Sequence, residues 1–250
     1  QNGDGSYTTP PLTEGTHNIT TTVTDPAGNT SPASDPIAVV IDTQPPAAPG
    51  NVQLSNNESG TPVPITNGAT NDTTPVLTGT AEPGSTVTVS DNGTELGTAT
   101  VGTDGTWSFT PTLGEGDHSL TATVTDPAGN SSNPSAPIVV TVDTSAPLAP
   151  GAVIISNDQS GTAVPIINGT TNDTTPVLSG TAEPGSTVTV SDGTTVLGSV
   201  SVGSDGNWSY TTPALSEGDH TLNATVTDAA GNSSTTATSV TITVDVTPPS

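Results

Sequence analysis

The stretch that decides the fold is Thr80-Ala-Glu-Pro-Gly-Ser-Thr-Val-Thr-Val-Ser-Asp91, which recurs unchanged at Thr181–Asp192. The two copies lie 101 residues apart. Within each copy Val and Thr alternate with period two, which is typical of a half-buried β-strand. The Glu-Pro-Gly before the alternation predicts a turn. The stretch therefore indicates a β-protein built from repeats of about 100 residues.

Further repeats set the expected domain boundaries. The segment Asn71–Leu77 recurs at Asn172–Leu178, and the motif Thr-Val-Thr-Asp-x-Ala-Gly-Asn ends at Asn29, Asn130 and Asn232. Pro-rich connectors separate the repeats. We therefore expect the C-terminal part of a first module at 1–43, a complete module at 44–144, and a complete module plus the start of the next linker at 145–250. Since the chain opens within a module and stops in a connector, we expect a segment of a longer tandem array.

Each complete module contains about seven short strands with Gly, Pro, Asn and Asp at the corners. Such a pattern over about 100 residues predicts an all-β, immunoglobulin-like β-sandwich. The Cys…Trp…Cys pattern of antibody domains is missing, because the chain has no Cys. In the middle module we expect strands near 51–55, 75–81, 85–91, 95–101, 106–110, 118–125 and 137–142.

The charge of the chain limits its partners. The 250 residues include no Lys or Arg and 24 Asp and Glu, which gives a formal net charge of −24. Nucleic acids and anionic membrane surfaces therefore have no basic patch to bind. We find no run of about 18 apolar residues that would insert into a membrane. The natural partner of such a chain is a cation.

Four motifs in fixed order carry a family resemblance: Gly-Thr-Ala-Glu-Pro-Gly-Ser-Thr-Val, Asp-Gly-x-Trp, Thr-Val-Thr-Asp-x-Ala-Gly-Asn and Val-Asp-Thr-x-x-Pro. They resemble the bacterial Ig-like repeats of giant, type I-secreted, non-fimbrial adhesins and biofilm-associated surface proteins. The resemblance covers essentially the whole chain. It implies an extended array of modules at the bacterial cell surface, with Ca²⁺ at and near the module junctions.

The strand order also predicts where acidic side chains gather. In a seven-stranded antiparallel sandwich, the loops after the second, fourth and sixth strands lie at the pole that receives the incoming connector. Asp42, Glu82 and Asp126 should therefore converge at the first junction. Carboxylates that no Lys or Arg neutralises repel one another, and Ca²⁺ accepts six to eight such oxygen ligands. Mg²⁺ fits less well, and transition metals favour His or Cys. The equivalent set at the second junction is Asp143, Glu183 and Asp228.

Other acidic residues leave two interpretations open. For Asp104 and Asp205, which stand in Asp-Gly turns, turn formation is favoured over cation binding. Asp25, with Asp4 nearby, would form only half of a site because its incoming connector is missing. At the opposite pole, a Ca²⁺ site within each module and a solvated polar loop are both open. That second group comprises Asn71, Asp72, Glu115 and Asp117 in the middle module and Asn172, Asp173, Glu217 and Asp219 in the last.

Two sets of residues are set aside as sites. His17, His118 and His220 occupy one position in three successive modules, so repeat logic places them apart rather than in a metal triad. Trp107 and Trp208 lie on matching strands and are expected in the core rather than on a sugar-binding face.

These features predict a structural role. We expect a stalk of Ig-like modules, stiffened by Ca²⁺ at the junctions, that projects an adhesive tip for cell adhesion or biofilm formation. Its partners would be Ca²⁺ and the neighbouring modules of the same chain. The alternative is an adhesin module that binds host glycan or protein directly, although aromatic residues make up only 2% of the chain. A disordered mucin-like spacer is a minor alternative. An enzyme is not expected, because no convergent catalytic groups are apparent.

Overall fold

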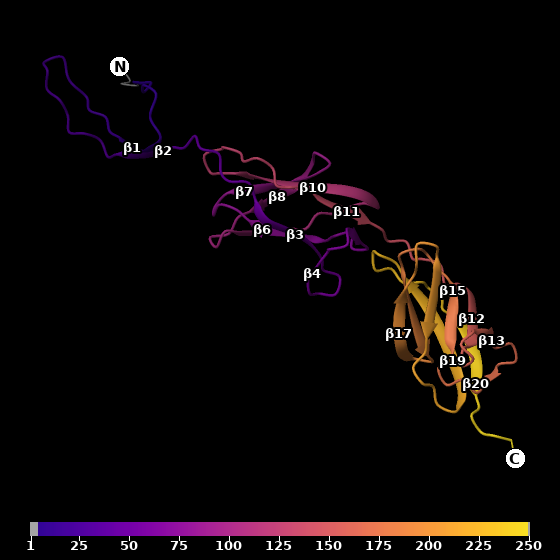
Figure 1. Cartoon of the computed structure of the whole chain (residues 1–250). Helices are drawn as coiled ribbons and strands as arrows, with labels where there is room; N and C mark the ends of the chain where they lie inside the picture. The colour runs from indigo at the N-terminus through magenta and orange to yellow at the C-terminus, as the bar shows by residue number, and fades with distance from the viewer. Residues whose placement is uncertain (1–4, 250) are drawn as a thin grey trace. The chain divides into compact units, whose positions relative to one another are not determined.

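The computed structural model describes residues 5–249, which form strands joined by turns and loops (Figure 1). Asp4 lies outside the described residues. The chain divides into two compact units. No helix capable of spanning a membrane occurs in the described part of the chain. One unit comprises Gln1–Leu54, Val76–Pro111 and Ser119–Ile138, and the other comprises Ser55–Pro75, Thr112–His118 and Val139–Ser250.

The first two strands form a small sheet of their own. Strands β1 (Gly15–Ile19) and β2 (Ile37–Ile41) pair antiparallel, with Gly15 opposite Ile41. Every residue of this pair is exposed or only half-buried. The pair carries the first Asp-x-Ala-Gly-Asn loop, at residues 25–29.

The middle module contains two sheets, with strand orders β4-β3-β6-β9 and β5-β11-β10-β7-β8. All seven predicted strands are present, and their ends differ from the predicted ones by two residues at most. The prediction of an all-β fold with two sheets per module is confirmed. The strands are β3 (Gly50–Asn56), β4 (Val63–Pro64), β5 (Ala69–Thr70), β6 (Val76–Thr80), β7 (Thr86–Asp91), β8 (Thr94–Thr100), β9 (Thr106–Phe109), β10 (Gly116–Thr125) and β11 (Ile138–Val142).

The last module repeats this arrangement, with sheets β13-β12-β15-β18 and β14-β20-β19-β16-β17. Leu178 and Trp208 from the first sheet and Val188, Val190 and Leu222 from the second belong to one buried core, so the two sheets form a sandwich. The period-two alternation decides which side chains point inward. The strands are β12 (Gly151–Asn157), β13 (Val164–Pro165), β14 (Thr170–Thr171), β15 (Val177–Thr181), β16 (Thr187–Asp192), β17 (Thr195–Ser201), β18 (Asn207–Thr211), β19 (Gly218–Thr227) and β20 (Thr238–Val244).

The long segment 56–72 is more ordered than the sequence indicates. It contains two strands of two residues each, β4 and β5. Strand β5 pairs parallel with β11, so the chain changes sheets within this segment. Two residues are too few to show a period, and the sequence therefore carries no strand signal there.

Trp107 is a core residue, as expected. Its side chain is 4% exposed, and Trp208 has the same exposure in the last module. Gly79 lies opposite Trp107 in the β6–β9 pair. A Cβ atom at Gly79 would lie 2.7 Å from Cζ2 of the indole, so glycine leaves the space that the ring fills.

Candidate functional site: the module junctions

The connectors begin with an aspartate that caps its own turn. The Asp42 carboxylate accepts a hydrogen bond of 3.0 Å from the Gln44 backbone N–H, and the Asp143 carboxylate accepts one of 2.9 Å from Ser145. Both aspartates are half-buried. These are local turns of the kind that Asp favours, and they set the direction in which each connector leaves its strand.

The Asp-x-Ala-Gly-Asn loop of the middle module is built around Asp126, which is 6% exposed. Its carboxylate accepts 2.9 Å hydrogen bonds from both the backbone N–H and the side-chain amide of Asn130. The bond from the Asn130 side chain is the main reason that the pKa of Asp126 is lowered. Asp228 accepts the same two bonds from Asn232 in the last module. The loop is therefore closed by a charged acceptor at its base.

The same asparagines reach the incoming connectors. Asn130 Nδ2 also donates to the carbonyl oxygen of Asp42, at 3.0 Å, and Asn232 Nδ2 donates to that of Asp143, at 2.8 Å. A primary amide carries two hydrogens, so one nitrogen serves both acceptors. We call this pair of bonds, from one Asn to a loop Asp and to a connector carbonyl, the junction clasp. It links the main chain of Asp42 to the loop of Asp126, and the main chain of Asp143 to the loop of Asp228.

The glutamates predicted at the junctions lie differently. Glu82 and Glu183 are exposed at the corners of their turns. The Ala81 N–H donates to the Gly105 carbonyl oxygen at 2.9 Å, so the turn of Glu82 lies beside the turn of Asp104. Within residues 5–249, no group of three or more His, Cys, Asp or Glu side chains is arranged to hold a metal ion. At each junction the structure thus joins one loop carboxylate and one connector carbonyl through an Asn, and does not gather the three predicted carboxylates.

Asp104 and Asp205 act within their own turns, as the favoured interpretation expects. Asp104 Oδ1 accepts from the Thr106 N–H at 3.0 Å and from its hydroxyl at 2.8 Å. Asp205 accepts from the Asn207 N–H and from its side-chain amide. These bonds, led by the Thr106 N–H for Asp104 and by the Asn207 side chain for Asp205, lower the pKa of both carboxyls. In the first module, Asp25 accepts from the backbone and side chain of Asn29 in the same way.

At the opposite pole, Asp72 and Asp173 are buried, at 1% and 0% exposed. Asp72 accepts 2.8 Å and 2.9 Å bonds from the Thr74 and Asn57 N–H groups, which fastens both ends of the segment between β3 and β6. Asp173 does the same with Thr175 and Asp158. The exposed Asp117 and Asp219 each accept a 2.7 Å bond from a threonine of the last strand.

A glutamate at this pole contacts the outgoing connector. The Glu115 carboxylate accepts bonds from the Thr144 hydroxyl, at 2.7 Å, and from the Thr144 N–H. The hydroxyl bond is the main cause of the lowered pKa of Glu115. Glu14 makes the same contacts with Thr43, and Glu217 bonds to the Thr247 hydroxyl. Each connector is therefore bonded to the module before it through its Thr and, at both junctions, to the module after it through the clasp.

Family comparison decides the identity of the repeat. The model of the bacterial Ig-like domain matches residues 1–43, 47–144 and 148–246. The chain belongs to the bacterial Ig-like domain family. This confirms the resemblance that the four motifs carry. No curated protein matches the chain.

Several solved structures are similar to these bacterial Ig-like modules. The tetra-tandem repeat from the extending region of a large adhesion protein has 26% identity and a TM-score of 0.33, over 94% of this chain and 58% of that one. A 1.5-MDa bacterial ice-binding adhesin has 22% identity and a TM-score of 0.36, over 93% and 74%. The fibronectin(III)-like modules of Clostridium thermocellum CbhA have 20% identity and a TM-score of 0.44, over 70% and 87%.

Sequence reasoning missed the neutral members of the junctions. Sequence reasoning identifies Asn130 and Asn232 only as the last residue of a repeated motif, although they supply every donor of the clasp. A signal is present, because the Asn follows the loop Asp at a constant spacing of four in all three modules. Thr43 and Thr144 each follow the connector Asp directly, whereas Thr247 stands two positions after Asp245.

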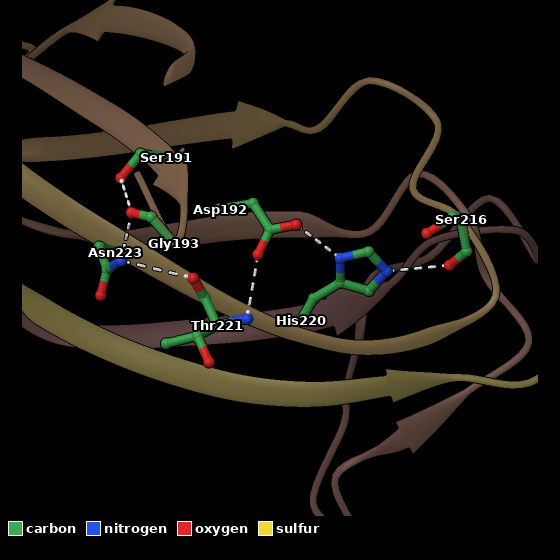
Figure 2. Close-up of polar contacts among 7 residues, drawn as sticks. All are labelled: Ser191, Asp192, Gly193, Ser216, His220, Thr221 and Asn223. Carbon is green, nitrogen blue, oxygen red and sulfur yellow. Dashed lines mark hydrogen bonds and ion pairs between the residues drawn. The ribbon is translucent and has the colours of Figure 1, made fainter. Parts of the chain in front are cut away.

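The histidines of the bacterial Ig-like modules are not a metal triad in the described chain. His220, 8% exposed, directs Nδ1 at the Asp192 carboxylate (2.6 Å) and Nε2 at the Ser216 carbonyl oxygen (2.9 Å), as Figure 2 shows. Both partners are acceptors, so this arrangement stabilises the ring that carries a proton on each nitrogen. The Asp192 hydrogen bond is the main cause of the raised pKa of His220. The pair is an ion pair within one module.

Proposed function

We propose that this chain is part of the stalk of a bacterial surface adhesin. Its Ig-like modules stand outside the cell and carry an adhesive tip away from the bacterial surface, and Ca²⁺ at the module junctions stiffens the array. The observation that carries this proposal is the junction clasp. It repeats at both junctions with the same atoms, and it links each connector to the module that follows.

The hydrogen bonds around each connector support the mechanical part of the proposal. At the second junction Thr144 is bonded to Glu115 of one module, and one residue earlier the Asp143 carbonyl is bonded to Asn232 of the next. Pro147 and Pro150 follow in the same connector and restrict the backbone further. Rotation about such a connector breaks hydrogen bonds on one side or the other, which suits a spacer that must resist bending.

The oxygen atoms of the junctions support the calcium part. At the second junction the Asp228 carboxylate and the Asp143 carbonyl oxygen both lie within 2.8 Å of a single amide nitrogen. Ca²⁺ prefers such oxygens, and rotation of the Asn232 amide would present a further one. Bound Ca²⁺ supplies the positive charge that a chain without Lys or Arg lacks. The residues that would hold it are Asp42 and Asp126 at the first junction and Asp143 and Asp228 at the second.

The test is thermal unfolding and small-angle X-ray scattering, first with Ca²⁺ and then with excess EDTA. Ca²⁺ at about 100 times its Kd stabilises the folded chain by about 2.7 kcal/mol through mass action. We therefore expect a higher Tm and a longer, stiffer particle with Ca²⁺. Mg²⁺ at the same concentration is the control and should have a smaller effect.

A variant separates the two junctions. Asp42→Ala should reduce the Ca²⁺ response at the first junction and leave that of the second unchanged. If Ca²⁺ changes neither the Tm nor the scattering of the parent chain, the junction carboxylates act only as turn formers and the calcium part of the proposal is wrong.

A further inference from the structure

A histidine is the third residue of β1, β10 and β19, and its ring contacts the main chain in the same way each time. In every case Nε2 lies close to the carbonyl oxygen of the residue four positions earlier. The distances are 2.7 Å from His17 to Thr13, 2.9 Å from His118 to Gly114 and 2.9 Å from His220 to Ser216. Figure 2 shows the third of these contacts. A carbonyl oxygen only accepts, so Nε2 is the donor.

This bond closes the corner that carries the glutamate of the outgoing connector. In the middle module the chain before the corner is anchored by Leu113, which is buried and donates its N–H to the Thr73 carbonyl oxygen at 2.8 Å. Glu115 then stands between two glycines, and the second of them, Gly116, has a φ of 116°. Glycine leaves the backbone free to adopt many conformations. The bond from the ring to the carbonyl just before Glu115 limits that freedom.

The last module shows that the His, the corner and the connector contact stay together when the chain changes length. Glu217 and His220 stand 102 residues after their counterparts in the middle module, whereas the preceding repeats are offset by 101. The connector Thr has moved by one more residue, to Thr247. Glu217 nevertheless bonds to the Thr247 hydroxyl at 2.7 Å, the same distance as Glu115 to the Thr144 hydroxyl. The spacing of three from Glu to His is constant in all three modules.

We propose that the histidine at this position is a positioning residue for the connector, and that it acts through the glutamate. By holding the carbonyl that precedes Glu115, the ring of His118 fixes where the Glu115 carboxylate lies. The carboxylate in turn accepts the N–H and the hydroxyl of Thr144. Without the ring bond the corner can swing toward solvent, and the connector loses both bonds to the module that it leaves. The inference rests on the proposed stalk function, because it assigns to the histidines the task of fixing the start of each connector.

The test uses two substitutions that each keep one side of the ring. His118→Gln keeps a side-chain nitrogen as many bonds from Cα as Nε2, whereas His118→Asn keeps one at the distance of Nδ1. Amide hydrogen exchange at Thr144 is measured by NMR in EDTA at one pH. We expect exchange to be about fivefold faster than in the parent chain for His118→Asn, since one hydrogen bond is lost, and close to the parent rate for His118→Gln. The amides of the buried Leu77 and Val89 report whether the module remains folded.

A third variant checks that the ring acts through the glutamate. Glu115→Ala removes the acceptor of the Thr144 N–H and should also speed its exchange. His118→Asn should add little on that background, because the two residues belong to one chain of contacts.

The proposal is overturned by unchanged exchange at Thr144 in His118→Asn or in Glu115→Ala, by equal acceleration in the Asn and Gln variants, or by additive effects of His118→Asn and Glu115→Ala. EDTA removes Ca²⁺ throughout, so the result does not depend on the calcium part of the proposed function. The scattering and melting response to Ca²⁺ can fail while the result at Thr144 stands, and the reverse also holds.

Discussion

His220 lies between two hydrogen-bond acceptors in a chain that has no Lys or Arg. Its two ring nitrogens face acceptors that have no proton to give, and Asp219 adds a second carboxylate nearby. Asp192 also accepts from the Thr221 N–H, which holds its carboxylate in place for the ring. The ion pair joins β16 to the start of β19, beside the turn that carries Glu217.

This residue makes the stability of the last module depend on pH. The Asp192 hydrogen bond raises the pKa of His220 in the folded state. The stabilisation is therefore complete below the ordinary His pKa of about 6.5 and is lost as the pH rises through the raised value. We expect the Tm difference between the parent and His220→Gln to be larger at about pH 5.5 than at about pH 9.

NMR titration of the ring protons checks the cause directly. Asp192→Asn is the control, because it removes the carboxylate that bonds to the ring. His220 should titrate at a higher pH in the parent chain than in this variant. Equal midpoints would show that Asp192 does not hold the proton.

At the scale of the strand pair, the fit between β6 and β9 depends on Gly79. Gly79→Ala places a methyl group 2.7 Å from the Trp107 ring, and β-sandwich packing leaves the ring nowhere to move without disturbing the core. We expect the middle module to lose about 1–3 kcal/mol, measured by chemical denaturation. Gly114→Ala, where nothing lies within 4 Å, is the control and should have little effect. Equal losses in both variants would mean that steric conflict is not the cause.

Elements of different length were predictable to different degrees. Strands of four residues or more are long enough to show a period of two, most plainly in the Val and Thr of β7 and β16, so these strands follow from the sequence. Strand β5 does not, because its place beside β11 is decided by the path of the chain after Asn56 rather than by its own two residues. The candidate site divides in the same way. Charge and strand order single out the junction aspartates as candidates. The clasp depends instead on how a neutral Asn side chain is oriented, and an argument from charge does not identify that side chain.

On the scale of the whole molecule, the net charge of −24 is opposed only by histidine. Repulsion between carboxylates destabilises the compact state. Salt weakens this repulsion, because it shortens the screening length from about 10 Å at 0.1 M to about 3 Å at 1 M. We expect the Tm to rise steadily with NaCl in the presence of EDTA. KCl is the control and should act equally, because screening does not depend on the identity of the cation. A Tm that falls with salt would show that ion pairs outweigh repulsion.

The acceptors of these junction contacts are main-chain carbonyls, and this affects how the sequence can change during evolution. Asn232 bonds to the connector through a main-chain carbonyl, and Asn67 and Asn71 bond in the same way to the carbonyls of Ala229 and Ala230 in the next loop. The side chain at Ala229 can therefore vary without altering its contact, whereas the position of Ala230 must stay small because that side chain is buried. Duplication or deletion of a whole repeat by recombination leaves each new joint with the same partners, so the length of the array can drift freely while its joints are conserved.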